Sequence, residues 1–264
     1  LMGETVIQVS SLGKRIKGKT ILEDISFEIN KGDCVALIGP NGAGKTVLMS
    51  CILGDKKPSS GQVLIDGKAG KAKNKIAVLL QENTIPNSLK VEELIAFFQS
   101  ISDNPLTNQE VQELLQFKED QYQQFADKLS GGQRRLLAFV LCLIDKPKIL
   151  FLDEPTAGMD TSTRQRFWEI VNDLKKSGTT ILYSSHYIEE VEHTADRILV
   201  LHQGKLIRDT TPYAMRHEEK EKQVTLPSSF VNIVHGLTDI YEITEKRDVI
   251  SFMTKDIEKV WQSL

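Results

Sequence analysis

The stretch GPNGAGKT occupies residues 39–46, that is Gly39, Pro40, Asn41, Gly42, Ala43, Gly44, Lys45 and Thr46. An apolar run at 34–38 precedes it, and a helical pattern at 46–53 follows it. Glycines at this spacing let backbone N–H groups turn inward around phosphate oxygens, and the start of a helix adds further donors. The pattern therefore predicts a phosphate-binding loop, not an ordinary Gly-rich turn. Lys45 would reach the outer phosphates, and the Thr46 hydroxyl would ligate Mg²⁺.

A second motif is the apolar run 149–152, which is followed directly by Asp153 and Glu154. We interpret it as a buried strand that ends in two carboxylates. By itself this is a weak signal, since many buried strands end in acidic turns. The carboxyl ends of parallel strands meet at one edge of a sheet, so we expect the pair beside the phosphate loop. Asp153 would then hold Mg²⁺ through water, and Glu154 would orient an attacking water or accept its proton.

A third motif is the pentapeptide LSGGQ at 129–133, which contains Ser130, Gly131, Gly132 and Gln133. Ser130 is a favourable helix N-cap, and the glycines after it expose backbone donors at the start of a helix. This predicts a second anion-binding site. A chain with one nucleotide site does not obviously need two such sites, although any capped helix could begin in this way.

The remaining sequence indicates how the chain is organised. Apolar and polar residues alternate over 5–30, which predicts antiparallel strands with one buried face. Farther along, strands alternate with helices, which predicts a parallel sheet covered on both sides. A helical insert is expected at about 82–145. Hairpin-like and short helical patterns after residue 212 predict a small α+β extension, so the expected domains are 5–212 and 213–264.

Composition excludes several classes of protein. The formal net charge of -3 argues against a dedicated nucleic-acid binder, because such proteins usually carry a basic excess. The longest apolar run, 136–144, is far shorter than the roughly 20 residues that a membrane-spanning helix needs. Three cysteines without C-x-x-C spacing indicate a reducing compartment and buried thiols, not disulfides or a zinc site.

Together, the three motifs resemble the nucleotide-binding subunits of ATP-binding cassette (ABC) transporters, over roughly residues 5–212. LSGGQ is the signature of that family. The resemblance implies an α/β P-loop NTPase cassette with a RecA-like mixed sheet core, an antiparallel β subdomain and an α-helical insert. It also implies that two cassettes, identical or different, pair head to tail. Ser130, Gly132 and Gln133 would then face the γ-phosphate of ATP held by the partner.

The resemblance assigns roles to three further residues. Gln81 follows a strand predicted at 76–80 and matches the Q-loop, which contacts Mg²⁺ and the attacking water. His186 matches the switch histidine, which contacts the γ-phosphate and Glu154. Asp160 matches the D-loop, which crosses the dimer interface. Without the resemblance, a lone glutamine or histidine would carry no such meaning.

One position departs from the family pattern. Family members usually place an aromatic residue that stacks on adenine in the loop before the strand at 20–22, and this chain has Ile16 there. Isoleucine packs on a base face without the stacking energy of an aromatic ring, about 1–3 kcal/mol. We therefore expect weaker adenine discrimination and tolerance of GTP.

The resemblance implies an ATPase that uses ATP and Mg²⁺ and drives a separate transmembrane permease. The run at 184–192 and the chain length are similar to exporter subunits of the ABC-2 type, which serve drugs, peptides or polysaccharides. Such a subunit would be cytoplasmic and peripheral on the inner face of the cell membrane. The alternative is a soluble cassette ATPase in a non-transport role such as iron–sulfur cluster assembly.

Overall fold

The computed structural model describes residues 3–69, 75–82, 85–217 and 221–263. The chain divides into two compact units, residues 1–212 and 213–264. Of the expected helical insert, residues 83 and 84 lie outside the described residues, as do residues 70–74 of the expected cassette and 218–220 of the expected extension.

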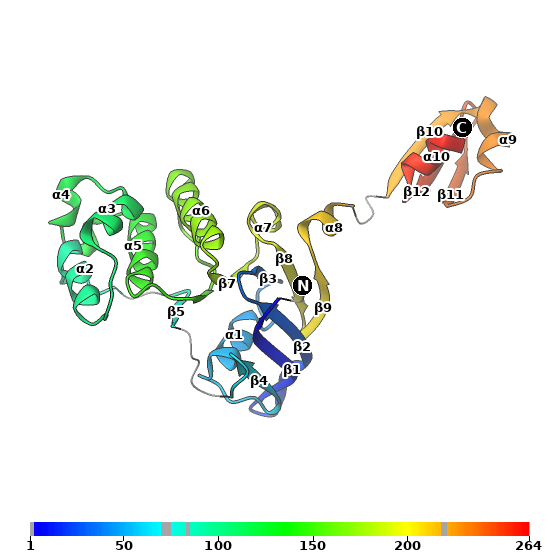
Figure 1. Ribbon diagram of the computed structural model, residues 1–264. Helices are drawn as coiled ribbons and strands as arrows, with labels where there is room; N and C mark the ends of the chain where they lie inside the picture. The colour runs from blue at the N-terminus through cyan, green and yellow to red at the C-terminus, as the bar shows by residue number, and fades with distance from the viewer. Residues whose placement is uncertain (1–2, 70–74, 83–84, 218–220, 264) are drawn as a thin grey trace. The chain divides into compact units, whose positions relative to one another are not determined.

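A six-stranded sheet forms the centre of the first unit, in the order β5-β6-β7-β3-β8-β9 (Figure 1). Only β9 runs antiparallel to its neighbour. The strands are β3 (Cys34–Ile38), β5 (Ile76–Leu79), β6 (Ile149–Leu152), β7 (Thr180–Ser185), β8 (Arg197–His202) and β9 (Lys205–Thr210). Every residue of β3, β6 and β7 is buried, as expected for parallel strands covered on both faces. This order brings the carboxyl ends of β5, β6, β7 and β3 side by side at one edge.

An antiparallel sheet of three strands packs beside this core. It has the order β2-β1-β4, with β1 (Thr5–Ile16), β2 (Lys19–Asn30) and β4 (Ser60–Ile65). Helix α1 (Lys45–Leu53) lies next to these strands (Figure 1). Ile25 and Ile29 of β2, Leu48 of α1 and Phe151 of β6 belong to one buried cluster. Each such side chain contributes about 1.5–3 kcal/mol through its removal from water.

The predicted helical insert is confirmed as a group of helices on one side of the unit (Figure 1). The group comprises α2 (Val91–Ser100), α3 (Asn108–Leu115), α4 (Glu119–Tyr122), the 3₁₀ turn η1 (Ala126–Lys128) and α5 (Gly131–Leu143). Helices α6 (Thr161–Lys176) and α7 (Ile188–Thr194) follow later in the chain. Phe139 of α5 and Phe167 of α6 are fully buried, with ring centroids 4.5 Å apart. This aromatic pair packs α5, which carries the signature residues, against α6.

The second unit has its own sheet and its own buried cluster. The sheet order is β10-β12-β11, with β10 (Lys222–Pro227), β11 (Ile240–Glu245) and β12 (Val249–Thr254). Helices α8 (Pro212–His217), α9 (Val231–Val234) and α10 (Ile257–Ser263) and the 3₁₀ turn η2 (Ser228–Phe230) complete this part of the chain. Val224, Val234, Ile250, Phe252 and Val260 form its core. The expected hairpin and final helix are confirmed, whereas the sequence did not predict β10, α8 and α9.

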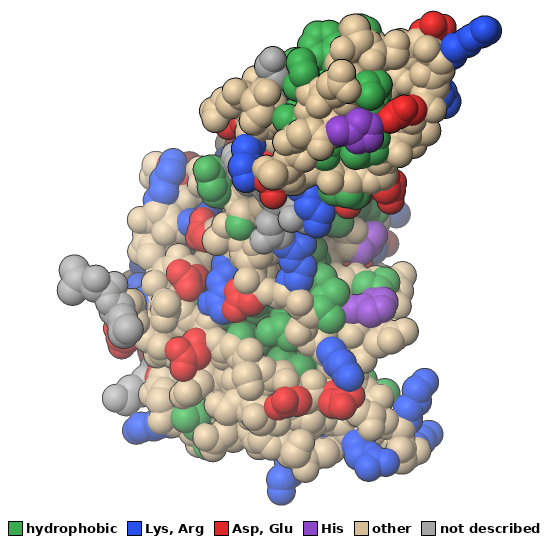
Figure 2. Space-filling view, turned by 90° about the vertical axis from the view of Figure 1, so that its right-hand side faces the viewer, with side chains coloured by type: hydrophobic (Ala, Val, Ile, Leu, Met, Phe, Trp, Pro, Cys, Tyr) green, Lys and Arg blue, Asp and Glu red, His purple; other side chains and the backbone are tan. Residues whose placement is uncertain are grey.

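One face of the protein is mixed in charge. On the face shown in Figure 2, Lys and Arg side chains alternate with Asp and Glu side chains, without an extended patch of one sign. Among the described residues, no helix has the length and apolar character needed to cross a membrane.

Candidate functional site

The phosphate-binding loop joins β3 to α1, as the sequence predicted. Its first glycine is required by close packing, because a Cβ on Gly39 would lie 2.2 Å from the main-chain oxygen of Leu201. Its last glycine, Gly44, has φ +104°, a conformation that L side chains rarely adopt. Inside the loop, the Ala43 N–H donates to the Pro40 carbonyl at 3.1 Å. Close packing and glycine backbone conformations therefore contribute to the shape of the loop.

The side chain of Lys45 hydrogen-bonds to two carbonyls of the phosphate-binding loop. Its Nζ donates to the carbonyl of Gly39, and at 3.3 Å to the carbonyl of Pro40. The residue is 6% exposed. Burial lowers the pKa of Lys45, while the carboxylates of Glu154 and Asp153 act in the opposite direction. A buried ammonium held by neutral carbonyls is available to anionic oxygens that enter the loop.

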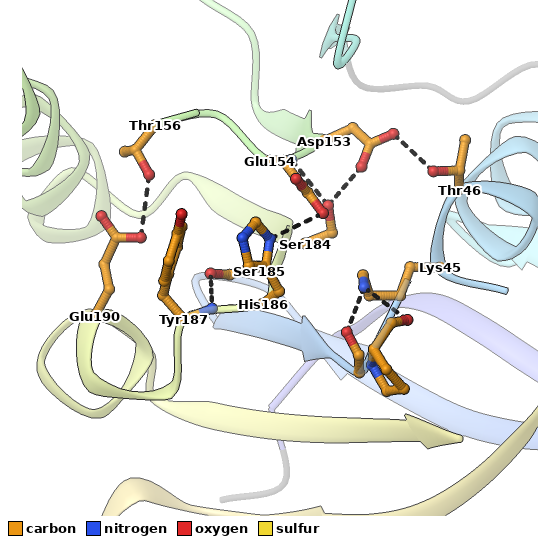
Figure 3. A network of polar contacts seen from close by, with 12 residues as sticks. Lys45, Thr46, Asp153, Glu154, Thr156, Ser184, Ser185, His186, Tyr187 and Glu190 are labelled. Carbon is orange, nitrogen blue, oxygen red and sulfur yellow. Dashed lines mark hydrogen bonds and ion pairs between the residues drawn. The ribbon is translucent and has the colours of Figure 1, made fainter. Parts of the chain in front are cut away.

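Asp153 directly follows β6, and its carboxylate accepts hydrogen bonds from two other elements (Figure 3). Its Oδ2 accepts a hydrogen bond from Thr46 Oγ1 at 3.1 Å. Its Oδ1 accepts one from Ser184 Oγ at 2.6 Å. The phosphate loop, the end of β6 and the end of β7 are thereby joined through one carboxylate that is 5% exposed.

Glu154 lies beside His186, as the resemblance implied (Figure 3). Glu154 Oε1 is 3.3 Å from His186 Nδ1, and the Glu154 side chain is 11% exposed. The backbone at Glu154 has φ +44°, and its N–H donates to Ser184 Oγ at 2.9 Å. A non-glycine residue in this region persists only when its surroundings hold it there. The glutamate carboxylate is thus placed by main-chain contacts.

Gln81 is exposed and lies two residues after the end of β5, with Leu80 between them. It lines a cavity of about 480 Å³ together with Glu154 and the loop residues Pro40, Asn41, Gly42, Gly44, Lys45 and Thr46. Ile21 and Val47 provide its apolar walls. The structure therefore brings together the predicted loop, Gln81 and Glu154 around one space. The Thr46 hydroxyl, the Asp153 carboxylate and the Gln81 amide offer oxygen ligands, the donor type that Mg²⁺ prefers.

The signature residues lie elsewhere in the same chain. Ser130 caps α5, because its Oγ accepts from the Gln133 N–H at 3.1 Å. Gly132 packs on the D-loop, where an added Cβ would meet Asp160 Oδ1 at 3.2 Å. Gly131 is exposed and lines a separate cavity of about 340 Å³. None of the described residues that line the phosphate-loop cavity comes from the signature.

Asp160 caps α6 in the manner of Ser130 on α5. Its Oδ2 accepts from the Thr163 N–H at 3.4 Å, and its Oδ1 accepts from the Thr163 hydroxyl. The hydrogen bond from the Thr163 hydroxyl lowers the pKa of Asp160.

Ile16 is half-buried at the end of β1, where it pairs with Lys19, and it is not among the described residues that line the phosphate-loop cavity.

Sequence reasoning missed two buried polar residues that support the site. Ser184 bonds to Asp153 and to Glu154, and Arg135 bonds to main-chain carbonyls at the end of β6. One signal was present for each. Ser184 lies two residues before His186, at the end of the strand that leads to it, and Arg135 lies four residues before Phe139 on the buried side of α5.

Comparison with known proteins defines the class of this fold and site. The family model described as "ABC transporter" matches residues 22–157. The chain belongs to the ABC transporter family, and its fold is the P-loop cassette with a mixed sheet, an antiparallel β subdomain and a helical insert. The described residues contain no cluster of three or more His, Cys, Asp and Glu side chains suited to a metal ion.

Two relatives within this family are similar to most of the chain. The probable multidrug ABC transporter ATP-binding protein YbhF of Escherichia coli (strain K12) is 31% identical over 245 residues, which cover 88% of this chain and 42% of YbhF. The chain thus spans less than half of the length of YbhF. The linearmycin resistance ATP-binding protein LnrL of Bacillus subtilis (strain 168) is 34% identical over 213 residues, 76% of this chain and 68% of LnrL.

A solved structure matches the cassette. It is cbiO1 from Clostridium perfringens, described as part of the ABC transporter complex cbiONQ. It has a TM-score of 0.70 and 26% identity, and the match covers 81% of this chain and 91% of cbiO1. These relatives favour a transporter subunit over an ATPase of iron–sulfur cluster assembly.

Proposed function

We propose that this chain is the ATP-hydrolysing subunit of an ABC transporter. The observation that carries the proposal is one connected set of polar contacts at the mouth of the phosphate loop. It runs from Thr46 through Asp153 and Ser184 to Glu154 and His186 (Figure 3). A nucleotide-binding module without hydrolysis would need the loop, but it would not need Glu154 and His186 aligned beside it.

The residues divide the work of phosphoryl transfer to water. The loop N–H groups and Lys45 bind the phosphates, and Thr46 and Asp153 would hold Mg²⁺ with Gln81 beside it. When bound, Mg²⁺ neutralises charge that develops on the phosphate oxygens. Glu154 orients the attacking water or accepts its proton, and His186 contacts both Glu154 and the γ-phosphate. Catalysis here is mainly positioning and charge stabilisation.

We propose further that the site is completed by a second cassette. The signature presents Ser130, Gly131, Gly132 and Gln133 at the start of α5, outside the phosphate-loop cavity of the same chain. A head-to-tail partner, either a second copy or a different cassette, would bring its signature to the γ-phosphate. Asp160 packs against Gly132 and would lie at that interface.

The chain would act on a separate membrane permease and work at the inner face of the membrane. We propose that the cargo is a drug, peptide or polysaccharide that is exported, and the names of the relatives, which include a probable multidrug transporter protein and a linearmycin resistance protein, favour a drug. A pull-down of the full chain with the product of a neighbouring gene for a multi-span membrane protein tests this part. Failure of the two proteins to associate, with ATPase activity intact, would favour a non-transport role.

The central experiment is Glu154→Gln in the full chain. We expect kcat for ATP hydrolysis to fall by about 100-fold or more, since general-base assistance contributes at least that much. Because ATP then persists, the variant should form dimers with ATP and Mg²⁺, measured by size-exclusion chromatography with light scattering. Glu169→Gln is the matched control, because Glu169 lies on the surface of α6 and pairs with Arg166. Full ATPase activity in Glu154→Gln would contradict the assigned role.

A further inference from the structure

Arg135 is a buried cation in the second turn of α5, two residues after the signature. It is 8% exposed, although arginine is rarely buried without a partner. Burial lowers the pKa of Arg135, and nearby Asp153 opposes that shift. Arginine nevertheless keeps its proton in proteins, so a positive charge remains enclosed here. Such a charge needs acceptors arranged around it.

The acceptors are main-chain carbonyls from the ends of two neighbouring strands. Nη1 donates to Leu80 O at 2.5 Å, just beyond β5. Nη2 donates to Asp153 O at 3.0 Å and to Glu154 O at 3.5 Å, and Nε donates to Pro155 O at 3.2 Å. Within the described part of the chain, only these carbonyls, and no carboxylate, accept hydrogen bonds from this guanidinium.

These carbonyls flank the reacting groups of the site. Leu80 directly precedes Gln81, and the main chain of Glu154 donates its N–H to Ser184 and accepts at its carbonyl from Arg135. Glu154 has φ +44°, a conformation that persists only where the surrounding structure holds it. The guanidinium therefore fixes the distance between the signature helix, the Q-loop and the glutamate.

We propose that Arg135 is a positioning residue through which the signature helix sets the placement of Gln81 and Glu154 for ATP hydrolysis. The inference rests on the function proposed above. Docking of the signature on a partner's nucleotide would move α5. Such a movement would displace the carbonyl of Leu80 and the carbonyls after β6 together. Arg135 is not among the described residues that line the phosphate-loop cavity.

The planar fork of arginine explains why this residue type is needed. Its five N–H donors point in fixed directions and reach both strand ends at once. Lysine keeps the charge but offers one ammonium group, which cannot span the carbonyls of Leu80 and Pro155 in the same geometry. Arg135→Lys thus removes the bridge without removing the charge.

Arg166→Lys is a matched control. Arg166 also donates to main-chain carbonyls, to Leu114 O at 2.9 Å and Glu113 O at 2.9 Å, but these join α6 to α3. We propose to measure kcat, KM for ATP, melting temperature and amide hydrogen exchange for the full chain and both variants. Exchange is followed without nucleotide in peptides that cover 78–82 and 149–157.

Arg135→Lys should exchange faster in both peptides, lose about tenfold in kcat and keep KM within about twofold. Arg166→Lys should leave both peptides and kcat unchanged. Unchanged exchange in Arg135→Lys overturns the proposal, and so does faster exchange with unaltered kcat. If the unsubstituted chain does not hydrolyse ATP while Arg135→Lys still exchanges faster, the proposed function fails and the positioning of the two strand ends stands.

Discussion

Ser184 shows how one hydroxyl can organise two carboxylate-bearing residues. Its Oγ donates to Asp153 Oδ1 and accepts from the Glu154 N–H, and the residue is fully buried. A hydroxyl can do both, because it has one proton and two lone pairs. The side chain needs no contact with nucleotide to matter for hydrolysis.

We predict that Ser184→Ala lowers stability and activity together. The change leaves the buried N–H of Glu154 without its acceptor, at a cost of about 1–3 kcal/mol. Thermal unfolding and kcat measure the two effects. Thr180→Val is the control, because the Thr180 hydroxyl is equally buried on β7 and accepts from the Gly32 N–H at 2.9 Å, away from the site. Thr180→Val should lower the melting temperature alone, and an equal fall of kcat in both variants would contradict the role of Ser184.

Ile16→Tyr tests the departure from the family pattern. An aromatic ring that stacks on adenine should strengthen ATP binding by about 1–3 kcal/mol and increase the preference for ATP over GTP. Titration with fluorescent nucleotide analogues measures both dissociation constants. Ile101→Tyr, at an exposed position at the end of α2, controls for added aromatic surface. Unchanged affinities in Ile16→Tyr would show that this residue does not meet the base.

At single residues, sequence reasoning succeeds where a local pattern demands one chemistry. Lys45, Asp153 and Glu154 were predictable because spacing, neighbouring strands and residue type agree. Ser184 and Arg135 were not, because each acts on main-chain atoms of segments far away in the sequence. A serine or an arginine within a short motif does not reveal which carbonyl or amide it will meet.

Two helices begin with the same kind of N-cap, but only one of the two caps is part of the signature. Ser130 caps α5, and Thr107 caps α3 (Asn108–Leu115) through a hydrogen bond of 3.2 Å from the Glu110 N–H. In both caps the third helical residue bonds back to the cap residue. The hydrogen-bond pattern is therefore the same in the two caps, whereas only Ser130 belongs to the signature.

We predict that Ser130→Ala and Thr107→Ala each cost about 1 kcal/mol of stability, the usual value of a cap. Only Ser130→Ala should also lower kcat, because its hydroxyl is expected at the γ-phosphate of a partner. Calorimetry and steady-state ATPase assays give the two quantities. Equal activity in the two variants would leave Ser130 with a capping role alone.

At the scale of elements, a strand could be predicted from the sequence where its residues are buried, and was missed where they are exposed. The buried strands β3 and β6 are continuous apolar runs, and the runs at 34–38 and 149–152 match their bounds. Strand β9 (Lys205–Thr210) forms one edge of the sheet and is largely exposed, so it needs no apolar pattern and was missed. Helix α6 begins at Thr161, because Asp160 caps it.

On the scale of the whole chain, the two units have separate buried clusters. The cluster around Val35, Leu48 and Phe151 lies within residues 1–212, and the cluster around Ile250 and Phe252 lies within 213–264. We propose on this basis that the first unit folds independently of the second. All three cysteines lie in the first unit, so their reactivity reports on its unfolding alone.

The cysteines should be nearly inert while the first unit is folded. Burial raises the pKa of Cys34 to about 12 and that of Cys142 to about 11, and it also raises the pKa of Cys51. Only the thiolate reacts, and at pH 8 a pKa of about 12 leaves roughly one Cys34 side chain in ten thousand ionised. Alkylation at pH 8 should therefore be at least about tenfold slower than in the unfolded chain, where thiols have a pKa near 8.5.

A series of denaturant concentrations then tests whether the first unit folds independently of the second. We predict that alkylation, followed by mass spectrometry, rises in one cooperative step and that all three thiols share its midpoint. The midpoint should stay the same in a chain shortened to residues 1–217, because no residue of the second cluster takes part in the first. A lower midpoint in the shortened chain would mean that residues 218–264 stabilise the cassette. Early reaction of Cys142 alone would instead locate a local opening at α5, the helix that carries the signature.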